Sequence, residues 1–172
     1  MKNIVLIGMP GSGKSTIGKL LSQNLDMNFI DMDEYIERSE QKSIKELFAQ
    51  GEYCFRDAET RCAKKLSSVK SHVLAAGGGI VIRKENIDFL KKNSVIIFLN
   101  RPVEKIIQDI DCGTRPLLAN GAKRLYDLYN ERIFLYKSYC DIEILNTTTI
   151  QDTVKKVIRN VENSHKREQG TC

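Results

Sequence analysis

The segment from Gly8 to Thr16 reads GMPGSGKST, and it constrains the fold more than any other stretch of the chain. It matches the pattern G-x-x-x-x-G-K-[ST]. It follows the apolar run Ile4–Ile7 and opens a helical pattern at Lys14–Leu25, which is the strand–loop–helix context that this pattern needs. We therefore predict a loop that curls around the phosphates of a nucleotide. A glycine-rich turn without a ligand is the alternative.

In such a loop, successive backbone N–H groups point inward at phosphate oxygens, and the positive end of the following helix adds to their attraction. Lys14 is expected to reach the β- and γ-phosphates, and the Ser15 hydroxyl is expected to contact Mg²⁺. The residues predicted to bind the nucleotide are Gly11, Ser12, Gly13, Lys14, Ser15 and Thr16.

Apolar runs alternate with segments of helical periodicity along the rest of the chain. The expected strands are Ile4–Ile7, Asn28–Asp31, His72–Ala75, Val95–Leu99 and Ile142–Leu145. Strands separated by helices pair in parallel through right-handed crossovers, with helices on both faces. We predict an α/β fold, a three-layer α/β/α arrangement around a five-stranded parallel sheet, with ligands at the carboxyl ends of the strands. Residues 1–163 are expected to form a single domain, and residues 164–172 a polar, disordered tail.

The composition of the chain limits the kinds of partner and the cellular compartment that we expect. With 172 residues, 41% of them hydrophobic, it has the make-up of a soluble globular protein, and no apolar stretch approaches the ~20 residues that span a membrane. The net charge of +5 comes without a basic run interleaved with aromatics before the tail, so no nucleic-acid partner is expected. The five cysteines are scattered and form no CxxC pair, which favours a reducing cytoplasm.

The stretch NFIDMDE places two carboxylates, Asp31 and Asp33, at the end of the second expected strand. A phosphoryl-transfer enzyme of this type needs an acidic residue at a strand end to help hold Mg²⁺. Asp31 could do this through water, and Asp33 could accept the proton of an attacking hydroxyl. The alternative is that one of them only caps the next helix.

Two further segments, residues 51–59 and 77–79, contain charged or glycine residues in an unusual pattern. In GEYCFRDAE, residues 51–59, Arg56 lies at helical spacing from Glu52 and Glu59, which by itself predicts an exposed ladder of ion pairs. The three glycines of LAAGGG, residues 77–79, end a central strand, where they favour a ligand lying against bare backbone. A mobile loop is the alternative.

Two arginines later in the chain are candidates for binding anions. Arg132 falls on the apolar stripe of a helix, so its guanidinium needs an anionic partner such as a substrate carboxylate, unless it snorkels or pairs internally. Arg115 lies in an irregular segment that has the length of a lid, and a lid arginine can close over a transferring phosphate. An exposed arginine in an idle loop is the alternative.

The segments GMPGSGKST, DMDEYIE, GEYCFRDAE, AAGGG, TRPLL and ERIFLY follow one another in this order. On these motifs, the chain resembles the shikimate kinase family over roughly residues 1–160. The resemblance implies a fold of the nucleoside-monophosphate-kinase type with a lid at about residues 110–123, usually monomeric. It also implies transfer of the γ-phosphoryl group of ATP to the 3-hydroxyl of shikimate, with Mg²⁺.

Carried over by motif, the resemblance assigns a role to each candidate. Asp33 binds the hydroxyl and acts as the base, with Lys14 and Arg115 as further catalytic residues and Arg115 also serving ATP. The resemblance implies that the substrate is bound by Asp33, Arg56, Gly78 and Arg132, and the metal by Ser15 and Asp31.

The chain departs from the family pattern at two places near the expected adenine site. Gln108 stands where members often carry an arginine, seven residues before Arg115, and Asn146–Thr149 follow the last strand where many members have another arginine. Asp109 and Asp111 add acidic groups near the expected phosphates. The alternatives are another small-molecule kinase of this fold, such as a gluconate kinase, and a non-catalytic nucleotide-binding module.

Overall fold

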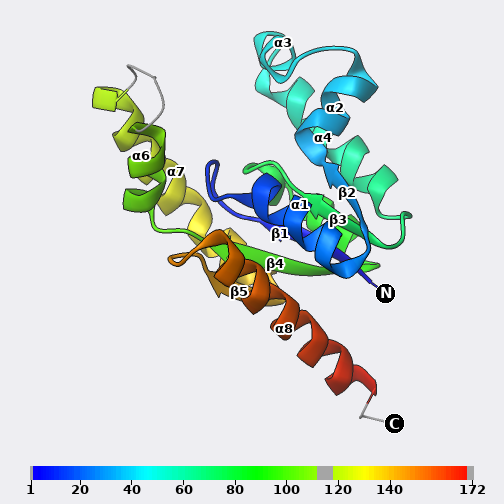
Figure 1. Ribbon diagram of the computed structural model, residues 1–172. Helices are drawn as coiled ribbons and strands as arrows, with labels where there is room; N and C mark the ends of the chain where they lie inside the picture. Colours follow the sequence, from blue (N-terminus) through cyan, green and yellow to red (C-terminus); the bar gives the residue numbers. More distant parts are fainter. Residues whose placement is uncertain (1, 112–117, 170–172) are drawn as a thin grey trace.

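A five-stranded parallel sheet forms the centre of the computed structural model, which describes residues 2–111 and 118–169 (Figure 1). The strands are β1 (Asn3–Ile7), β2 (Asn28–Asp31), β3 (His72–Ala75), β4 (Ser94–Asn100) and β5 (Ile142–Leu145). Their order in the sheet is β2-β3-β1-β4-β5, and every neighbouring pair is parallel. The predicted five-stranded parallel sheet is confirmed, and the helices between its strands supply the crossover connections that parallel pairing needs.

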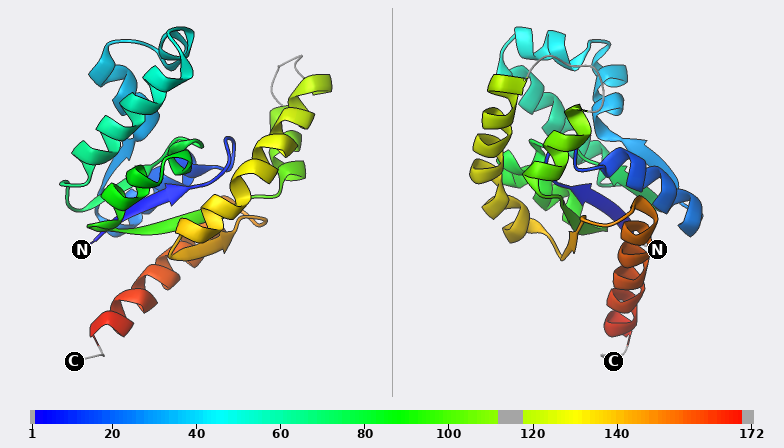
Figure 2. Two further views of the ribbon diagram at one scale, coloured as in Figure 1. Left: turned by 180° about the vertical axis from the view of Figure 1, so that it is seen from behind. Right: turned by 60° about the vertical axis from the view of Figure 1, so that its left-hand side comes forward.

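Helices cover both faces of the sheet. They are α1 (Lys14–Leu25), α2 (Met32–Glu40), α3 (Ile44–Ala49), α4 (Glu52–Leu66), α5 (Lys84–Lys91), α6 (Val103–Asp111), α7 (Leu118–Tyr139) and α8 (Ile150–Gln169), with a 3₁₀ turn, η1, at Ile80–Ile82. Figure 2 shows α7 and α8 crossing the sheet on opposite sides. No helix within the described residues is both long enough and apolar enough to span a membrane.

Side chains alternate along the strands between two separate cores. On β1, Val5 and Ile7 pack with residues of α2 to α7, whereas Ile4 and Leu6 pack with residues of α1 and α8. This period of two is expected of a strand that is buried on both faces. The predicted three-layer α/β/α arrangement is therefore confirmed.

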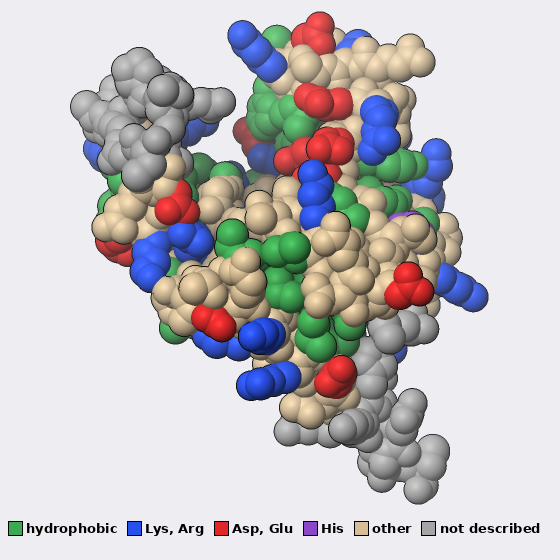
Figure 3. Space-filling model, in the orientation of Figure 1, with side chains coloured by type: hydrophobic (Ala, Val, Ile, Leu, Met, Phe, Trp, Pro, Cys, Tyr) green, Lys and Arg blue, Asp and Glu red, His purple; other side chains and the backbone are tan. Residues whose placement is uncertain are grey.

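The topology brings the candidate residues to one edge of the sheet. Because all strands are parallel, their carboxyl ends meet at the same edge, where β1 leads into the Gly8–Gly13 loop at the centre. The α2–α4 segment and the pair α6–α7 rise from this edge on either side of a hollow (Figures 1 and 3).

Two segments differ from the sequence expectations. Helix α8 continues to Gln169, whereas a tail was predicted from residue 164, because helix-forming Lys, Arg, Glu and Gln follow without a glycine or proline before Gly170. The predicted lid at residues 110–123 is partly helical, since α6 ends at Asp111 and α7 begins at Leu118. Leucine and alanine at the start of α7 favour helix strongly enough to outweigh Asn120 and Gly121.

Candidate active site

The loop between β1 and α1 has the shape that its glycines predict. Gly13, directly before α1, has a φ of 89°, a left-handed conformation that glycine adopts without steric cost. The Ser12 N–H donates to the Met9 carbonyl (3.1 Å), which closes a tight turn inside the loop. The loop is thereby fixed in a curled conformation at the N-terminus of α1, where anions bind most readily.

Lys14 is buried beneath this loop. Its Nζ donates to the carbonyl oxygens of Gly8 (2.9 Å) and Met9 (2.8 Å), so the ammonium lies inside the curl of the loop. Burial lowers the pKa of Lys14 to about 8, against the opposing attraction of Asp33 and Asp31. A desolvated cation in this position is strongly attracted to a phosphate anion.

A cleft of about 550 Å³ runs along the carboxyl edge of the sheet over this loop. It is lined by Pro10, Gly11, Gly13, Lys14, Ser15, Thr16, Ile17, Asp31, Asp33, Ala75–Gly78, Arg101, Asp109, Asn146 and Ile150. The strand order divides it into two halves on either side of the loop. The acceptor half carries residues that follow β2 and β3, and the distal half carries residues that follow β4 and β5.

Asp31 caps helix α2, as one alternative from the sequence had it, and it also accepts a hydrogen bond from Ser15. One carboxylate oxygen accepts from the backbone N–H groups of Asp33 (3.0 Å) and Glu34 (3.5 Å), which caps α2. The other oxygen accepts from the Ser15 hydroxyl at 2.6 Å. Two oxygen groups, one from the start of α1 and one from the end of β2, therefore meet where they could hold a hard divalent cation.

Asp33 is the second residue of α2 and lies in the acceptor half of the cleft. Its Oδ1 atom is buried and has no hydrogen-bond partner among the described residues. Burial raises the pKa of Asp33, the nearby Asp31 charge raises it further, and Lys14 opposes the shift. A half-buried carboxylate with an unused acceptor oxygen and a raised pKa is a candidate general base.

Arg56 is held in a buried ion-pair network, and the exposed ladder predicted from the sequence is wrong. Its Nη1 donates to Glu59 Oε2 (2.5 Å), while its Nε (3.1 Å) and Nη2 (2.9 Å) both donate to Glu52 Oε1. Arg56 and Glu59 are only 7% and 1% exposed. Helical spacing could not show this, because the burial comes from α4 packing against the segment that follows β3.

The glycines after β3 allow that packing, and they belong to a fixed segment. A Cβ atom on Gly77 would lie 2.6 Å from Asp33 Oδ1, and one on Gly79 would overlap the Arg56 guanidinium. Both glycines are buried. Side chains of Asp33 and Arg56 can therefore approach bare backbone at these two glycines, and the contact of a ligand with this segment stays a prediction.

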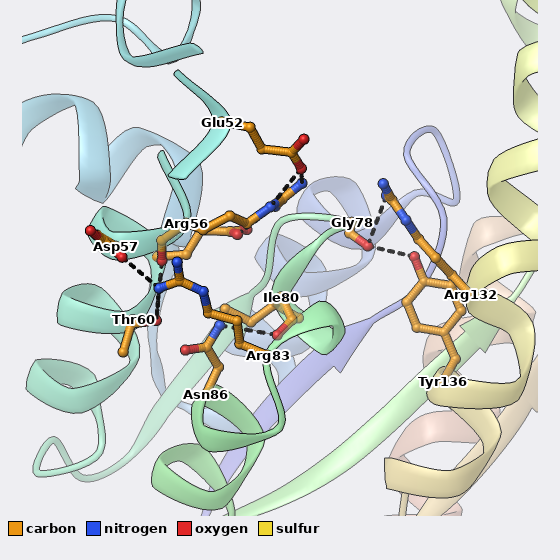
Figure 4. A network of polar contacts seen from close by, with 11 residues as sticks. Glu52, Arg56, Asp57, Thr60, Gly78, Ile80, Arg83, Asn86, Arg132 and Tyr136 are labelled. Atoms are coloured by element: carbon orange, nitrogen blue, oxygen red, sulfur yellow. Dashed lines mark hydrogen bonds and ion pairs between the residues drawn. The ribbon is translucent and has the colours of Figure 1, made fainter. Parts of the chain in front are cut away.

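Gly78 lies between the two candidate arginines (Figure 4). Its carbonyl oxygen accepts from Tyr136 Oη (2.6 Å) and from Arg132 Nη1 (3.3 Å), both on α7, while Arg56 approaches from α4 on the other side. Burial raises the pKa of Tyr136 to about 12, so its hydroxyl stays protonated and remains a hydrogen-bond donor at neutral pH. Two guanidinium groups from distant elements thus flank one turn of backbone beside Asp33.

Comparison with known proteins agrees with this geometry. The family model described as shikimate kinase matches residues 10–162. A curated shikimate kinase of Clostridium botulinum is 47% identical over 165 residues, which cover 95% of this chain and 100% of that protein.

The chain belongs to the shikimate kinase family.

Solved structures of the family have the same fold. The shikimate kinase of Acinetobacter baumannii, determined in complex with shikimate, is 34% identical with a TM-score of 0.86, and the match covers 95% of this chain and 94% of that one. A gluconokinase of Sinorhizobium meliloti is only 14% identical with a TM-score of 0.65, over 96% of this chain and 97% of that one. That likeness shows the fold alone, of the nucleoside-monophosphate-kinase type predicted from the sequence.

Most of the predicted site residues of this shikimate kinase family member meet around the cleft. Ser12 is an exception within the loop, because its side chain is fully buried and does not line the cleft. Arg56 and Arg132 adjoin the acceptor half through the glycine segment and do not line the cleft itself. Arg115 lies outside the described residues.

Of two further residues that line the distal half, the sequence reasoning missed Arg101 and noted Asn146 only as a departure from the family pattern. Asn146 is buried after β5, where its Nδ2 donates to the Ser12 carbonyl (2.9 Å) and its Oδ1 accepts from Thr153 Oγ1 (2.9 Å). Arg101 follows β4. Both residues directly follow a strand, and this position could have predicted them as site residues, since ligands of parallel sheets bind at the carboxyl ends of the strands.

Proposed function

We propose that this protein transfers the γ-phosphoryl group of ATP to the 3-hydroxyl of shikimate, giving shikimate 3-phosphate and ADP. One observation carries the proposal more than any other. The unpartnered, buried oxygen of Asp33 lies in a cleft between the phosphate-binding loop and a backbone turn that two arginines flank. This arrangement supports a base that lies between a donor site and an anion site, as transfer to the hydroxyl of a carboxylic acid requires.

On the donor side, the loop amides and Lys14 would bind the phosphates. The ammonium already lies within the loop, where it would exchange its backbone acceptors for phosphate oxygens. Its position costs no reorganisation during transfer, which is how fixed charges lower the barrier of such reactions.

Ser15 and Asp31 are the residues that would hold Mg²⁺. The cation is usually bound by one or two protein oxygens together with substrate phosphates and water, and the oxygens of these two side chains lie 2.6 Å apart at the loop. When bound, Mg²⁺ neutralises part of the charge on the transferring phosphoryl group.

On the acceptor side, Asp33 would accept the proton of the attacking hydroxyl, which its desolvated position and raised pKa favour. Arg56 and Arg132 would bind the shikimate carboxylate, since a guanidinium donates two parallel hydrogen bonds to such a group. Glu52, whose side chain is 64% exposed, now accepts from Nε and Nη2 of Arg56 and would yield that edge to the substrate. Glu59 would remain as the buried anchor.

Compartment and assembly follow from the same proposal. We infer that the enzyme acts as a monomer in the cytoplasm, on small molecules and on neither nucleic acid nor membrane. The scattered cysteines, which form no CxxC pair, fit a reducing compartment.

A parallel assay of acceptors tests the proposal. Purified protein with Mg²⁺ and ATP is offered shikimate, gluconate and nucleoside monophosphates separately, and ADP release is followed by enzymatic coupling. We expect turnover with shikimate alone, with ³¹P and ¹³C NMR placing the phosphate on the 3-oxygen. Turnover with gluconate or a nucleotide at a comparable kcat/KM would overturn it.

A further inference from the structure

An ion pair in the distal half of the cleft has no part in the transfer chemistry described so far. Arg101 follows β4, and Asp109 lies eight residues later on α6. Arg101 Nη2 donates to Asp109 Oδ2 at 2.5 Å, and both residues line the cleft. The Arg101 side chain is only 17% exposed, so the pair is partly desolvated on the arginine side.

The position of this pair relative to the loop tells which part of a nucleotide it meets. The transferred phosphoryl group has to face Asp33, which follows β2 on one side of the loop. Arg101 follows β4 on the other side, and Ile106 of α6 packs so closely on the loop that a Cβ atom on Gly11 would come within 2.9 Å of it. The end of the nucleotide remote from the γ-phosphate therefore extends toward Arg101.

The chemistry of Arg101 suits a flat aromatic group better than a phosphate. Asp109 already neutralises its charge and fixes one edge of the guanidinium, while its buried Nε has no hydrogen-bond partner among the described residues. A guanidinium held by its edge presents a flat face, and arginine stacks on aromatic rings through that face. Ile150 lines the same half and is 40% exposed, which adds apolar surface for a ring.

We propose that Arg101 lies against the purine base of the bound nucleotide and that Asp109 positions its guanidinium. The inference rests on the proposed nucleotide-binding function and extends it to the base. It also accounts for an acidic residue in a cleft that binds an anion, because Asp109 is paired with Arg101 and the pair as a whole carries no net charge. Such a pair favours a nucleoside over a bare polyanion.

A charge-conserving double variant separates base contact from general electrostatics. R101A/D109N removes one positive and one negative charge, so the net charge of the cleft is unchanged. Calorimetry with Mg²⁺-ADP and, separately, with inorganic tripolyphosphate then measures the two kinds of binding. We expect the dissociation constant for ADP to rise about 5- to 30-fold, as for loss of a desolvated cation–π contact, and that for tripolyphosphate to stay within about twofold.

The single variants sharpen the test. In R101A, Asp109 is left unpaired near the phosphates, so we expect both ligands to bind more weakly than in the wild type. Adding D109N then restores tripolyphosphate binding and leaves ADP binding weak. The matched control is R83A/D57N, which removes an ion pair of 2.7 Å on α4 and the turn before α5, outside the cleft, and changes neither affinity.

Two results would overturn the inference. If R101A/D109N binds ADP as tightly as the wild type does, the ion pair has only a structural role. An equal loss for ADP and tripolyphosphate, in a variant whose urea-unfolding midpoint matches that of the control, would make Arg101 a phosphate ligand. Failure of the proposed function is distinguishable, because the wild type would then bind ADP with the expected variant effects and yet not phosphorylate shikimate.

Discussion

The phosphate-binding loop takes its shape from its own backbone, whereas the acceptor half of the cleft is assembled from elements far apart in the chain. Gly8–Gly13 and the start of α1 place amides and Lys14 with hydrogen bonds that span six residues or fewer. Asp33, Arg56 and Arg132 come from α2, α4 and α7, and they meet around the glycines after β3.

The difference extends to how charge is stabilised. Lys14 is balanced mainly by backbone carbonyl dipoles, so the donor side keeps its cation free for a ligand. On the acceptor side, Arg56 is balanced by the full charges of Glu52 and Glu59. Breaking a buried pair leaves an uncompensated charge, so substitutions of those residues disturb folding as well as binding. Substitutions of Asp33, Lys14 and Arg132 are therefore better suited to test the donor side and the acceptor side separately.

Asp33→Asn is expected to have the largest effect, because it removes the base and leaves the donor side intact. We expect kcat to fall about 10²- to 10⁴-fold, since an amide cannot accept the hydroxyl proton, while the ADP affinity measured by calorimetry changes little. Unchanged turnover would remove Asp33 from the reaction, and a parallel loss of ADP binding would show that the two halves are not separable.

The pH profile gives a second measure of Asp33. Its pKa is raised by burial and by Asp31, and the base works only when ionised. Wild-type kcat/KM is therefore expected to be full above this raised pKa and to fall as pH drops through it, at a higher pH than for an ordinary aspartate. The fall is read from stopped assays at constant ionic strength, and Asp33→Asn should lack it.

Lys14→Met tests the donor side, with a loss of transfer of about 10²- to 10³-fold from removal of one preorganised charge. The same substitution is expected to raise the free energy of unfolding of the unliganded protein at pH values below 8. The pKa of Lys14 falls from 10.5 to about 8 on folding, so below pH 8 the buried charge destabilises the unliganded protein. Between pH 8 and 10.5 the unfolded chain binds more protons, and wild-type stability therefore rises with pH.

Urea unfolding at pH 7.5 and pH 10 checks this sign. The rise between the two values should be present in the wild type and reduced in Lys14→Met. An equal rise in both proteins would mean that the backbone carbonyls fully compensate the ammonium, and the contrast in how the two sides balance charge would then be lost.

The same contrast explains what the sequence alone could predict. The loop residues and the strand that precedes them were placed correctly, because a contiguous motif carries its own geometry. Asp31 and Asp33 were located by their position at a strand end, and the structure adds that Asp31 caps α2 while bonding Ser15.

The remaining features depend on tertiary packing, which local patterns do not carry. Helical spacing predicted an exposed Arg56, yet packing against Gly79 buries it. Asn146 bonds Ser12 across 134 residues, so no local pattern could reveal that contact. The extension of α8 to Gln169 was missed because polar composition was weighed above helix propensity.

Arg132→Ala tests the anion site of the acceptor half. Arg132 Nη1 donates to the Gly78 carbonyl at 3.3 Å and forms no ion pair with a carboxylate of the described residues, so its removal breaks no ion pair there. We expect the KM for shikimate to rise about 10- to 100-fold, as for loss of a charged hydrogen bond, with the KM for ATP within about threefold. The control is Arg124→Ala, an exposed arginine on the same helix. A larger rise for ATP than for shikimate would contradict the assignment.

Asn146→Ala is expected to have the smallest effect on binding, and it tests whether the loop is self-supporting. The buried amide joins the Ser12 carbonyl to Thr153 on α8, so its loss leaves polar groups unpaired at a cost of about 1–3 kcal/mol in unfolding free energy. Asn86→Ala is the matched control, because Asn86 is equally buried and donates to the Ile80 carbonyl (3.1 Å) away from the cleft.

If the loop needs this distant support, Asn146→Ala weakens ADP binding about 2- to 10-fold while Asn86→Ala destabilises the fold without changing that affinity. If both variants lose stability and neither loses affinity, the backbone of the loop alone fixes its curled conformation. The measurement therefore tests how local the donor side is, because the Asn146 amide reaches the loop through the Ser12 carbonyl.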